Sequence, residues 1–414
     1  MSHPIALYLH IPFCETKCPY CDFNTYAGIE PLIPQYVDAL AEELRLWGQA
    51  LADSPKVKVI LPPQKSSEGR RVPQQVGTIF FGGGTPSYLP PQHIQRLMDT
   101  ARASFHLLPD AEATLESNPG DVTPERLAAW RQAGINRLSI GVQSLDDGLL
   151  SLLGRRHTSA EAVQAYRNAR AAGFTNVNLD LMFGLPRQTL AQWRDTLAPI
   201  LDLRPEHLSM YCLTLEEGTP LWAWVRSGAV PEPDPDLAAD MYLLAQELAE
   251  AAGYDHYEIS NWALPGYEAR HNLAYWRSQP YLGVGPGAHS YLDGYRFAVA
   301  KSPRTYIQQV RECSSLPASL WTPQALKERG LLESSEAIDA RTARGETMMM
   351  GLRLSEGVAD AAFRGRFGVG LRETYASQIL DLEEVGLLCW EGDCLKLTAR
   401  GKLLGNEVFQ RFLG

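Results

Sequence analysis

Short apolar runs alternate with amphipathic stretches through the first half of the chain. The runs are typical of buried β-strands, and apolar positions three and four residues apart predict helices between them. The predicted strands are Ile5–Ile11, Val76–Phe81, Ala113–Glu116, Arg137–Ile140, Asn176–Met182 and His207–Leu213. The predicted helices are Pro34–Leu51, Pro91–Phe105, Pro124–Ala133, Ser159–Ala172, Leu190–Leu201 and, further on, Asp236–Ala252. Six successive β–α units predict an α/β fold with a parallel sheet and right-handed crossovers.

This alternation favours a partial (β/α)6 barrel that is open on one side. A complete barrel of eight units would need two more clear repeats, and the pattern weakens after Glu216. Between the predicted helix Pro34–Leu51 and the second strand, residues 53–75 read as an exposed loop, in which Lys56–Leu61 is a candidate short strand. An aromatic segment without helical periodicity covers residues 254–295.

The pattern changes character again from about Trp321. Helices are predicted at Glu346–Leu352, Leu371–Val385 and Ala399–Phe412, with a hairpin at Gly386–Leu397 that turns at Gly392-Asp393. Helices combined with a small hairpin indicate a winged-helix-like module. We therefore divide the chain into a barrel domain, residues 1–300, and a C-terminal domain, residues 301–414.

Glycines and polar side chains gather where the predicted strands end. Because the carboxyl ends of parallel strands meet at one edge of a sheet or barrel, these residues should lie close together. The run Gly82-Gly83-Gly84-Thr85 lets a ligand approach the backbone, and no Lys-Ser/Thr follows that would make a phosphate loop. The polar set at the same edge could bind hydroxyl, ammonium or carboxylate groups, and it consists of Glu116, Gln143, Arg155 and Asp180.

The most specific chemical motif follows the first predicted strand: Cys14, Cys18 and Cys21 at the spacing CxxxCxxC. Thiolates hold iron–sulfur clusters, which usually take four ligands. Three thiolates in one loop leave an iron of a [4Fe–4S] cluster open to a small molecule, and this spacing is the signature of radical S-adenosylmethionine (SAM) enzymes. A zinc site that lacks its fourth ligand and buried structural thiols are the alternatives. Tyr20 could pack against a purine ring or fill space behind a cluster.

Composition limits the remaining choices. The chain has 414 residues, which favours two domains, and its formal net charge of −10 argues against a general affinity for nucleic acid. Seven cysteines, three of them in one motif, fit a reducing compartment better than a disulfide framework. We expect no signal peptide and no membrane-spanning helix, because the N-terminus leads into a strand and no apolar run approaches about 18 residues. The expected location is the cytoplasm.

Several motifs together resemble the HemN/HemW group of radical SAM proteins. They cover nearly the whole chain and begin with Tyr8-Leu-His10-Ile-Pro12-Phe13-Cys14 and Cys21-Asp22-Phe23-Asn24. The others are Phe81-Gly-Gly-Gly-Thr-Pro86, Glu116-Ser-Asn-Pro119, Gly141-Val-Gln-Ser144, Asp180-Leu-Met-Phe-Gly-Leu-Pro186 and Gly285-Pro-Gly-Ala-His289-Ser. The resemblance implies a radical SAM fold with a [4Fe–4S] cluster on Cys14, Cys18 and Cys21. It also implies a SAM site formed by Tyr8, Tyr20, Gly82, Gly83, Gly84, Thr85, Glu116, Gln143, Arg155 and Asp180.

The group contains oxygen-independent coproporphyrinogen III oxidases and haem chaperones, and three features resemble the chaperone branch. HemN proteins have a cysteine two residues after the third cluster ligand, where this chain has Phe23, and a long extension before the cysteine loop, where this chain has 13 residues. The third feature is the HNxxYW motif, His271-Asn272-Leu273-Ala274-Tyr275-Trp276. Imidazole is a common haem ligand, and tyrosine and tryptophan offer flat faces to a porphyrin.

The resemblance therefore implies a haem chaperone that binds haem through His271, Asn272, Tyr275 and Trp276 and delivers it to haem proteins, some of them membrane-associated. Coproporphyrinogen III oxidation is the alternative activity, and for His271 the alternative role is a buried structural histidine. No nucleic-acid partner is expected, and an open-sided barrel is compatible with a homodimer. Whether SAM is cleaved stays open, as do the roles of residues 53–75, Cys389 and Cys394. We discount the GxGxxA match at Gly283–Ala288, because a nucleotide fingerprint needs a strand before it and a helix after it.

Overall fold

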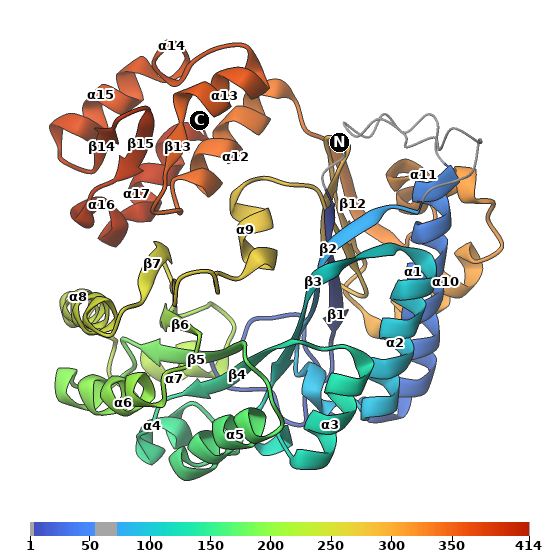
Figure 1. Ribbon diagram of the computed structural model, residues 1–414, viewed down its shortest axis with the longest axis horizontal. Coiled ribbons are helices and arrows are strands. Elements are labelled where there is room, and N and C mark those ends of the chain that lie inside the picture. Colours follow the sequence, from blue (N-terminus) through green and yellow to red (C-terminus); the bar gives the residue numbers. More distant parts are fainter. Residues whose placement is uncertain (1–3, 54–72, 414) are drawn as a thin grey trace.

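The computed structural model describes residues 4–53 and 73–413, and Figure 1 shows how its elements are arranged. The candidate strand Lys56–Leu61 and most of the loop 53–75 lie outside the described residues. Within the described ranges, no helix is both long enough and apolar enough to cross a membrane.

A mixed sheet of twelve strands forms the frame of the protein, in the order β12-β11-β10-β9-β1-β2-β3-β4-β5-β6-β8-β7. Its six central strands are β1 (Ile5–Ile11), β2 (Gln75–Gly83), β3 (His106–Ser117), β4 (Arg137–Gln143), β5 (Val177–Phe183) and β6 (His207–Cys212). They pair in chain order and all run parallel. The partial (β/α)6 barrel predicted from the alternation is confirmed, and the ends of the sheet leave it open on one side (Figure 1).

Helices cover the convex face of this sheet (Figure 1). The helices of the barrel are α1 (Ile33–Asp53), α2 (Pro91–Ser104), α3 (Pro124–Ala133), α4 (Asp147–Leu152), α5 (Ser159–Ala171), α6 (Leu190–Leu203), α7 (Pro220–Arg226) and α8 (Pro235–Ala251). Side-chain caps fix where several begin: the hydroxyls of Thr123, Thr158 and Thr189 each accept a backbone N–H from the first turn of α3, α5 and α6. The sequence pattern missed α4 and α7 because each has fewer than eight residues.

The second half of the chain widens the sheet at both ends, which the weak sequence pattern did not predict. The added strands are β7 (Asp255–Glu258), β8 (Asn261–Ala263), β9 (Tyr281–Val284), β10 (His289–Leu292), β11 (Tyr295–Val299) and β12 (Leu332–Ala337). The GxGxxA match does overlap a strand, because β9 begins at Tyr281 and pairs in parallel with β1. A strand rather than a helix follows Gly285–Ala288, so the GxGxxA match is not a nucleotide fingerprint.

The remaining elements include a second, smaller sheet in the order β13-β15-β14. They are α9 (Arg270–Trp276), α10 (Pro303–Cys313), α11 (Pro323–Glu328), α12 (Ala340–Gly351), β13 (Val358–Ala359), α13 (Asp360–Phe367), α14 (Leu371–Thr374), α15 (Ala376–Glu384), β14 (Leu388–Glu391), β15 (Cys394–Leu397), α16 (Ala399–Leu403) and α17 (Gly405–Phe409). Single 3-10 turns lie at Glu30–Leu32, Pro86–Tyr88, Pro119–Asp121, Ala318–Leu320 and Gln410–Phe412. The predicted hairpin is β14–β15, with its turn at Gly392-Asp393.

The buried apolar residues of the described chain form a large core, a small C-terminal core and a third cluster within the barrel, made of Leu149, Leu153, Met182, Leu185, Leu213 and Leu221. The large core extends as far along the chain as Leu332, and the small core begins at Met348. Helices α10 and α11 pack on the large core and β12 belongs to the large sheet, so these elements, although they follow residue 300, are packed with the barrel.

Helix α9 carries the HNxxYW motif and lies on the concave side of the sheet, between β2 and the C-terminal module (Figure 1). The guanidinium of Arg353 lies 4.5 Å from the ring centre of Trp276, and Arg277 forms an ion pair with Glu356 at 3.0 Å. The module is also held at β7, where the amide of Ser355 donates to the carbonyl of Tyr257 at 2.9 Å. The motif is therefore part of the junction between barrel and module.

A buried carboxylate fixes the start of α9. Glu112 of β3 is 6% exposed and accepts the backbone N–H groups of Arg270 and His271, each at 3.1 Å. These amides have no partner within the helix.

We predict that Glu112→Ala lowers the free energy of unfolding by about 1–3 kcal/mol, because it leaves two buried amides without an acceptor. Asp110→Ala is the matched control on the same strand: its exposed ion pair with Arg270 should contribute less than about 1 kcal/mol. Denaturant unfolding of both variants measures the difference. Equal losses would show that the capping carboxylate does not hold α9.

Candidate functional site

Alternate residues of the central strands divide between an apolar outer layer and a polar interior. Leu115, Leu138 and Leu179 point outward into the large core. Their neighbours point to the concave side, since successive side chains of a strand face opposite ways. These interior side chains are unusually polar for a barrel and include Thr114, Glu116, Arg137, Ser139, Asn178 and Asp180.

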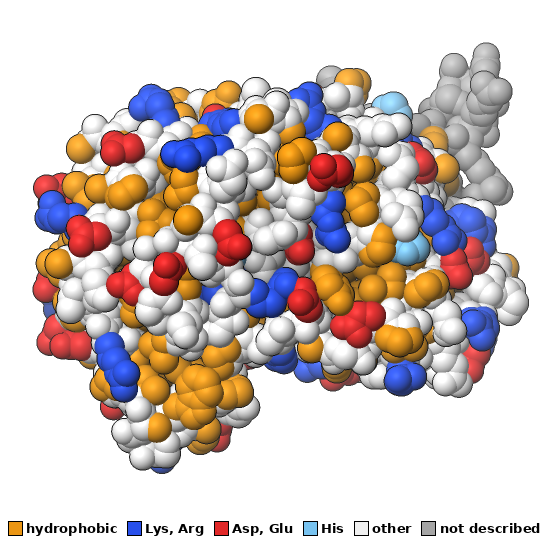
Figure 2. Space-filling view, turned by 90° about the horizontal axis from the view of Figure 1, so that it is seen from below, with side chains coloured by type: hydrophobic (Ala, Val, Ile, Leu, Met, Phe, Trp, Pro, Cys, Tyr) orange, Lys and Arg blue, Asp and Glu red, His pale blue; other side chains and the backbone are white. Residues whose placement is uncertain are grey.

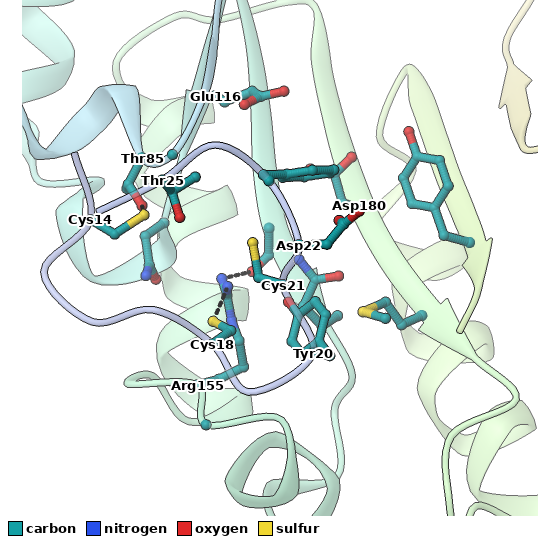
Figure 3. A pocket seen from close by; sticks show the side chains of 18 of the residues that line it. Cys14, Cys18, Tyr20, Cys21, Asp22, Thr25, Thr85, Glu116, Arg155 and Asp180 are labelled. Carbon is teal, nitrogen blue, oxygen red and sulfur yellow. Dashed lines mark hydrogen bonds between the residues drawn. The ribbon is translucent and has the colours of Figure 1, made fainter. Parts of the chain in front are cut away.

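At the carboxyl ends of these strands lies a cavity of about 400 Å³ (Figure 3). It brings together most of the predicted site: Cys14, Cys18, Tyr20, Cys21, Gly83, Gly84, Thr85, Glu116, Gln143, Arg155 and Asp180. These residues come from five stretches of chain that are far apart in sequence, so their convergence reflects the parallel sheet rather than local structure.

Backbone hydrogen bonds hold the cysteine loop against the end of β2. Gly84 donates to the carbonyl of Ile11 and Thr85 to that of Phe13, both at 2.8 Å. A Cβ on Gly84 would lie 2.7 Å from the Phe13 oxygen and 3.1 Å from the Cys14 sulfur, so only glycine fits.

The far side of the loop is fixed by residues near the end of the barrel domain. The Asn24 amide donates to the carbonyls of Pro286 at 2.9 Å and Lys301 at 3.0 Å. Gly287 has φ +79° and lies against Asn24, which leaves no room for a side chain. The Gly285–Ala288 loop therefore supports the cysteine loop from behind.

The three thiols face the cavity and have donors beside them. The Thr85 hydroxyl lies 3.4 Å from the Cys14 sulfur, and the Arg155 guanidinium lies 3.7 Å from the Cys18 sulfur (Figure 3). Donors at this position stabilise thiolates, although burial raises the pKa of the Cys14 and Cys21 thiols. Among the described residues, no three His, Cys, Asp or Glu side chains are close enough to hold a single metal ion. Three cysteine thiols on one cavity wall match the type and number of donors in a three-cysteine cluster site.

Two buried carboxyl groups give the cavity its charge preference. Burial, followed by the nearby Asp180, raises the pKa of Glu116 to about 8. Burial also raises the pKa of Asp180, which accepts hydrogen bonds from Ser139 and Asn178. Two carboxyl groups in this setting favour a ligand that brings positive charge, because a cation would stabilise both ionised forms.

The backbone at this edge is shaped for close approach. Gly83 has φ +114°, and its N–H donates to Glu116 at 3.1 Å. Gln143 also has a positive φ, 66°, where the register between β4 and β5 shifts. A non-glycine residue in this region is uncommon and often marks a site. Arg155 donates to the carbonyl of Gly141 at 2.8 Å and leaves its Nε without a partner.

Two residues predicted to contact SAM do not line the cavity. The Tyr8 hydroxyl bonds to His10 at 3.0 Å. A Cβ on Gly82 would meet the rings of Phe80 and Tyr8, each closer than 3.0 Å. Tyr8 and Gly82 lie on the interior face of the barrel, below the cavity. Each is further than Gly83 from the edge where the strands end.

The HNxxYW segment also lies away from the cavity lining. His271 is 1% exposed, and its ring nitrogens lie 2.8 Å from the Thr78 hydroxyl and 2.8 Å from the Tyr275 hydroxyl. Its ring stacks on Phe80 at 4.9 Å. Burial, with a smaller effect from Arg137, lowers the pKa of His271 to about 3. In this conformation His271 is a buried histidine without a free ring nitrogen.

The other motif residues differ from one another in their surroundings. Tyr275 is packed against Tyr281 and His271, Trp276 stacks with Arg353, and Asn272 is half-buried. The segment is thus an internal packing unit rather than an exposed aromatic surface.

The sequence analysis missed several residues that line the cavity. They are Thr16, Asp22, Phe23, Thr25, Ser117, Asn118, Ser139, Gly141, Gly154, Arg156, Met182, Tyr211, Cys212, Leu213, Thr214 and Glu216. Counting in steps of two from Gln143 along β4 reaches Gly141 and Ser139, and from Asp180 along β5 it reaches Met182, so the alternation of the strands would have found these residues. Tyr211 lies on β6, where the sequence offered no such starting residue. Cys212 is exposed and lies at the rim of the cavity.

Comparison with known proteins agrees with this geometry. Residues 8–200 match the Radical SAM superfamily, and residues 338–404 match the HemN C-terminal domain. Among solved structures, the radical SAM enzyme coproporphyrinogen III oxidase (HemN) from Escherichia coli aligns with a TM-score of 0.78 at 24% identity. The alignment covers 100% of this chain and 90% of that one, which establishes a shared fold.

Curated relatives align over essentially the full length. A Bacillus subtilis protein named Heme chaperone HemW is 36% identical over 410 residues, covering 99% of both chains. A protein of the same name from Escherichia coli is 36% identical over 417 residues, covering 99% of this chain and 98% of that one. A mitochondrial Bos taurus protein, Radical S-adenosyl methionine domain-containing protein 1, is 36% identical over 432 residues, covering 99% and 90%.

The raised pKa of Glu116 predicts a pH-dependent difference in stability. Its folded-state pKa of about 8 exceeds the ordinary 4.5, so the stability linked to this group is present below pH 4.5 and is lost as pH rises through 8. The melting temperature of Glu116→Gln, minus that of the ligand-free parent, should therefore increase from pH 5 to pH 9. Glu247→Gln, on the exposed side of α8, is the control and should track the parent. If the melting temperatures of Glu116→Gln and the parent change by the same amount from pH 5 to pH 9, the raised pKa is contradicted.

Proposed function

The chain belongs to the radical SAM superfamily and, within it, to the HemW family, and we propose that it is a haem chaperone that carries a [4Fe–4S] cluster and SAM. The observation that carries this proposal is the full-length similarity to relatives named as haem chaperones. The cavity supports it, because three thiols and a cation-favouring pair of carboxyl groups meet there.

In this proposal, Cys14, Cys18 and Cys21 hold the cluster, and the bound cluster supplies an open iron and a transferable electron. Arg155 and Thr85 stabilise the thiolates through the contacts described above. The SAM-binding groups are the backbone at Gly83 and Gly84, the carboxylates of Glu116 and Asp180, and the side chains of Tyr20 and Gln143. Each of these lines the same cavity as the thiols.

We propose that haem contacts the HNxxYW segment, with His271 as the iron ligand. Ligation then requires α9 to shift, because one of the two hydrogen bonds of the ring, to Thr78 or Tyr275, must break to free a nitrogen. Two features favour such a shift. Helix α9 has only seven residues, and its polar contacts with the C-terminal module include a cation–π pair and an exposed ion pair, each of modest strength.

The partners of this protein would be haem and haem-accepting apoproteins in a reducing cytoplasm, some of the acceptors being membrane-associated. Acidic and basic side chains are interspersed over the face shown in Figure 2, rather than gathered into the broad basic surface that nucleic acids require. The net charge of −10 is in line with this. We also propose a homodimer that forms through the open side of the barrel. The mass of the holoprotein in solution tests this.

Anaerobic reconstitution tests the cluster assignment. We expect about four iron and four sulfide per chain, with the corresponding loss of visible absorbance in Cys14→Ala, Cys18→Ala and Cys21→Ala. Cys313→Ala, a buried thiol in α10, should load normally and is the matched control. The reconstituted protein with SAM and coproporphyrinogen III should form no protoporphyrinogen, and formation of that product would contradict the chaperone proposal.

Titration with hemin tests the haem ligand. His271→Ala should weaken hemin binding at least about tenfold and shift the Soret band, because the iron loses its imidazole. His207→Ala is the matched control: His207 is also fully buried, with both ring nitrogens bonded, to Asn178 at 2.6 Å and Tyr257 at 2.8 Å. Unchanged affinity and spectrum in His271→Ala would refute the assignment, and equal losses in both variants would indicate a general packing effect.

A further inference from the structure

A buried arginine in the barrel interior has no charged partner. Arg137 begins β4 and is 2% exposed. Among the described residues no carboxylate lies within ion-pair distance of it, and its buried Nε has no hydrogen-bond partner. Buried guanidinium groups are rarely left unpaired, because removing the charge from water without a partner is costly.

The residue beside it is also unsatisfied. Thr114 of β3 pairs directly with Arg137 of β4, so the two side chains are neighbours on the interior face. Thr114 is 0% exposed, and its hydroxyl has no hydrogen-bond partner. A guanidinium can only donate hydrogen bonds and a hydroxyl can also donate, so one group that only accepts hydrogen bonds would satisfy both.

The surroundings supply no such group. His207 and His271, which lie near Arg137, have both ring nitrogens engaged. Of the interior carboxylates, Glu112 is committed to the amides that start α9. Asp180 is bonded to Ser139 and Asn178, and Glu116 accepts from Gly83. Asp180 is near enough for the charge of Arg137 to oppose the rise in its pKa that burial causes, but no described carboxylate forms an ion pair with Arg137, so an acceptor from outside the described chain would satisfy both groups.

The position of Arg137 connects it to the cavity. Arg137, Ser139 and Gly141 are successive inward-facing positions of β4, and the latter two line the cavity. Two residues of a strand span about 6.5 Å, so Arg137 lies one layer below the cavity lining. The charge changes sign over this distance, from the carboxyl groups of Glu116 and Asp180 at the rim to a guanidinium below.

We propose that Arg137 and Thr114 form a carboxylate-binding subsite at the floor of the barrel, and that its occupant is a propionate of haem. This inference rests on the proposed function, since haem is the carboxylate-bearing cargo there. A planar guanidinium matches a carboxylate in a two-point contact, which a point charge would not. The subsite lies in the same interior as His271, so one cargo molecule would meet both groups.

The test compares Arg137→Met with the parent, both cluster-loaded. Hemin should bind Arg137→Met at least about tenfold more weakly, whereas hemin dimethyl ester, which lacks free carboxylates, should bind both proteins equally. The ligand-free melting temperature of Arg137→Met should equal or exceed that of the parent, because an unpaired buried charge is removed. Arg137→Lys keeps the charge but loses the planar contact, and it should lose part of the affinity.

Arg170→Met is the matched control, since Arg170 is half-buried and paired with Glu206 at 2.6 Å. It should lower the melting temperature and leave hemin binding unchanged. If Arg137→Met and Arg137→Lys both behave like Arg170→Met, Arg137 is structural and the subsite is refuted.

A second probe separates this inference from the proposed function. Millimolar acetate at constant ionic strength should raise the melting temperature of the parent and not that of Arg137→Met. If the parent binds no hemin, the proposed function fails, and the acetate result still decides the subsite. An acetate effect that is equal in both proteins, or absent from both, would overturn it.

Discussion

The geometry of the site depends on a short set of backbone hydrogen bonds between the cysteine loop and the end of β2. Gly84 and Thr85 donate to carbonyls on either side of Pro12, and Cys14 and Tyr26 complete the loop from the other direction. These contacts require the two backbones to lie closer than a side chain permits. The parallel pairing of β1 with β2 sets this approach, and the remaining strands of the barrel bring their polar ends to the same place.

Charge is sorted by depth inside the barrel. Glu116 and Asp180 lie near the rim, the guanidinium of Arg137 lies below them beside His207 and His271, and Glu112 lies deeper still, where it accepts the amides that start α9. Keeping such groups away from water is unfavourable unless something offsets the cost. A polar interior of this kind is therefore a poor way to stabilise a fold and a good way to bind a ligand that carries both signs of charge. The apolar outer layer and the helices that cover it provide the stability that the interior lacks.

The sequence predicted those helices and strands that are defined by the residues within and next to them. Five of the six central strands and most covering helices could be predicted to within a few residues, because they show a clear apolar pattern and their ends carry caps or glycines. The exception is β3, which begins at His106, seven residues before the predicted Ala113. The cavity could be predicted because parallel strands present their carboxyl ends together. The strands β7 to β11 could not, because they have three to five residues and are fixed by partners far along the chain. His271 shows the limit for single residues: its motif suggested an accessible ligand, whereas packing of α9 into the barrel buries it. No spacing rule reveals whether a histidine on a short helix faces inward.

The hydrogen bonds from Asn24 to Pro286 and Lys301 span more than 260 residues of chain. On the ribosome, the three thiols emerge among the first residues, long before the segment that supports their loop has been made. A nascent chain therefore exposes a flexible trio of cysteines for most of its synthesis, at about 5–20 residues per second. Before the segment 285–301 has folded, the cysteine loop lacks the hydrogen bonds from Asn24 that hold its far side. The order of synthesis thus places the final geometry of the cysteine loop after completion of the segment 285–301 that supports it.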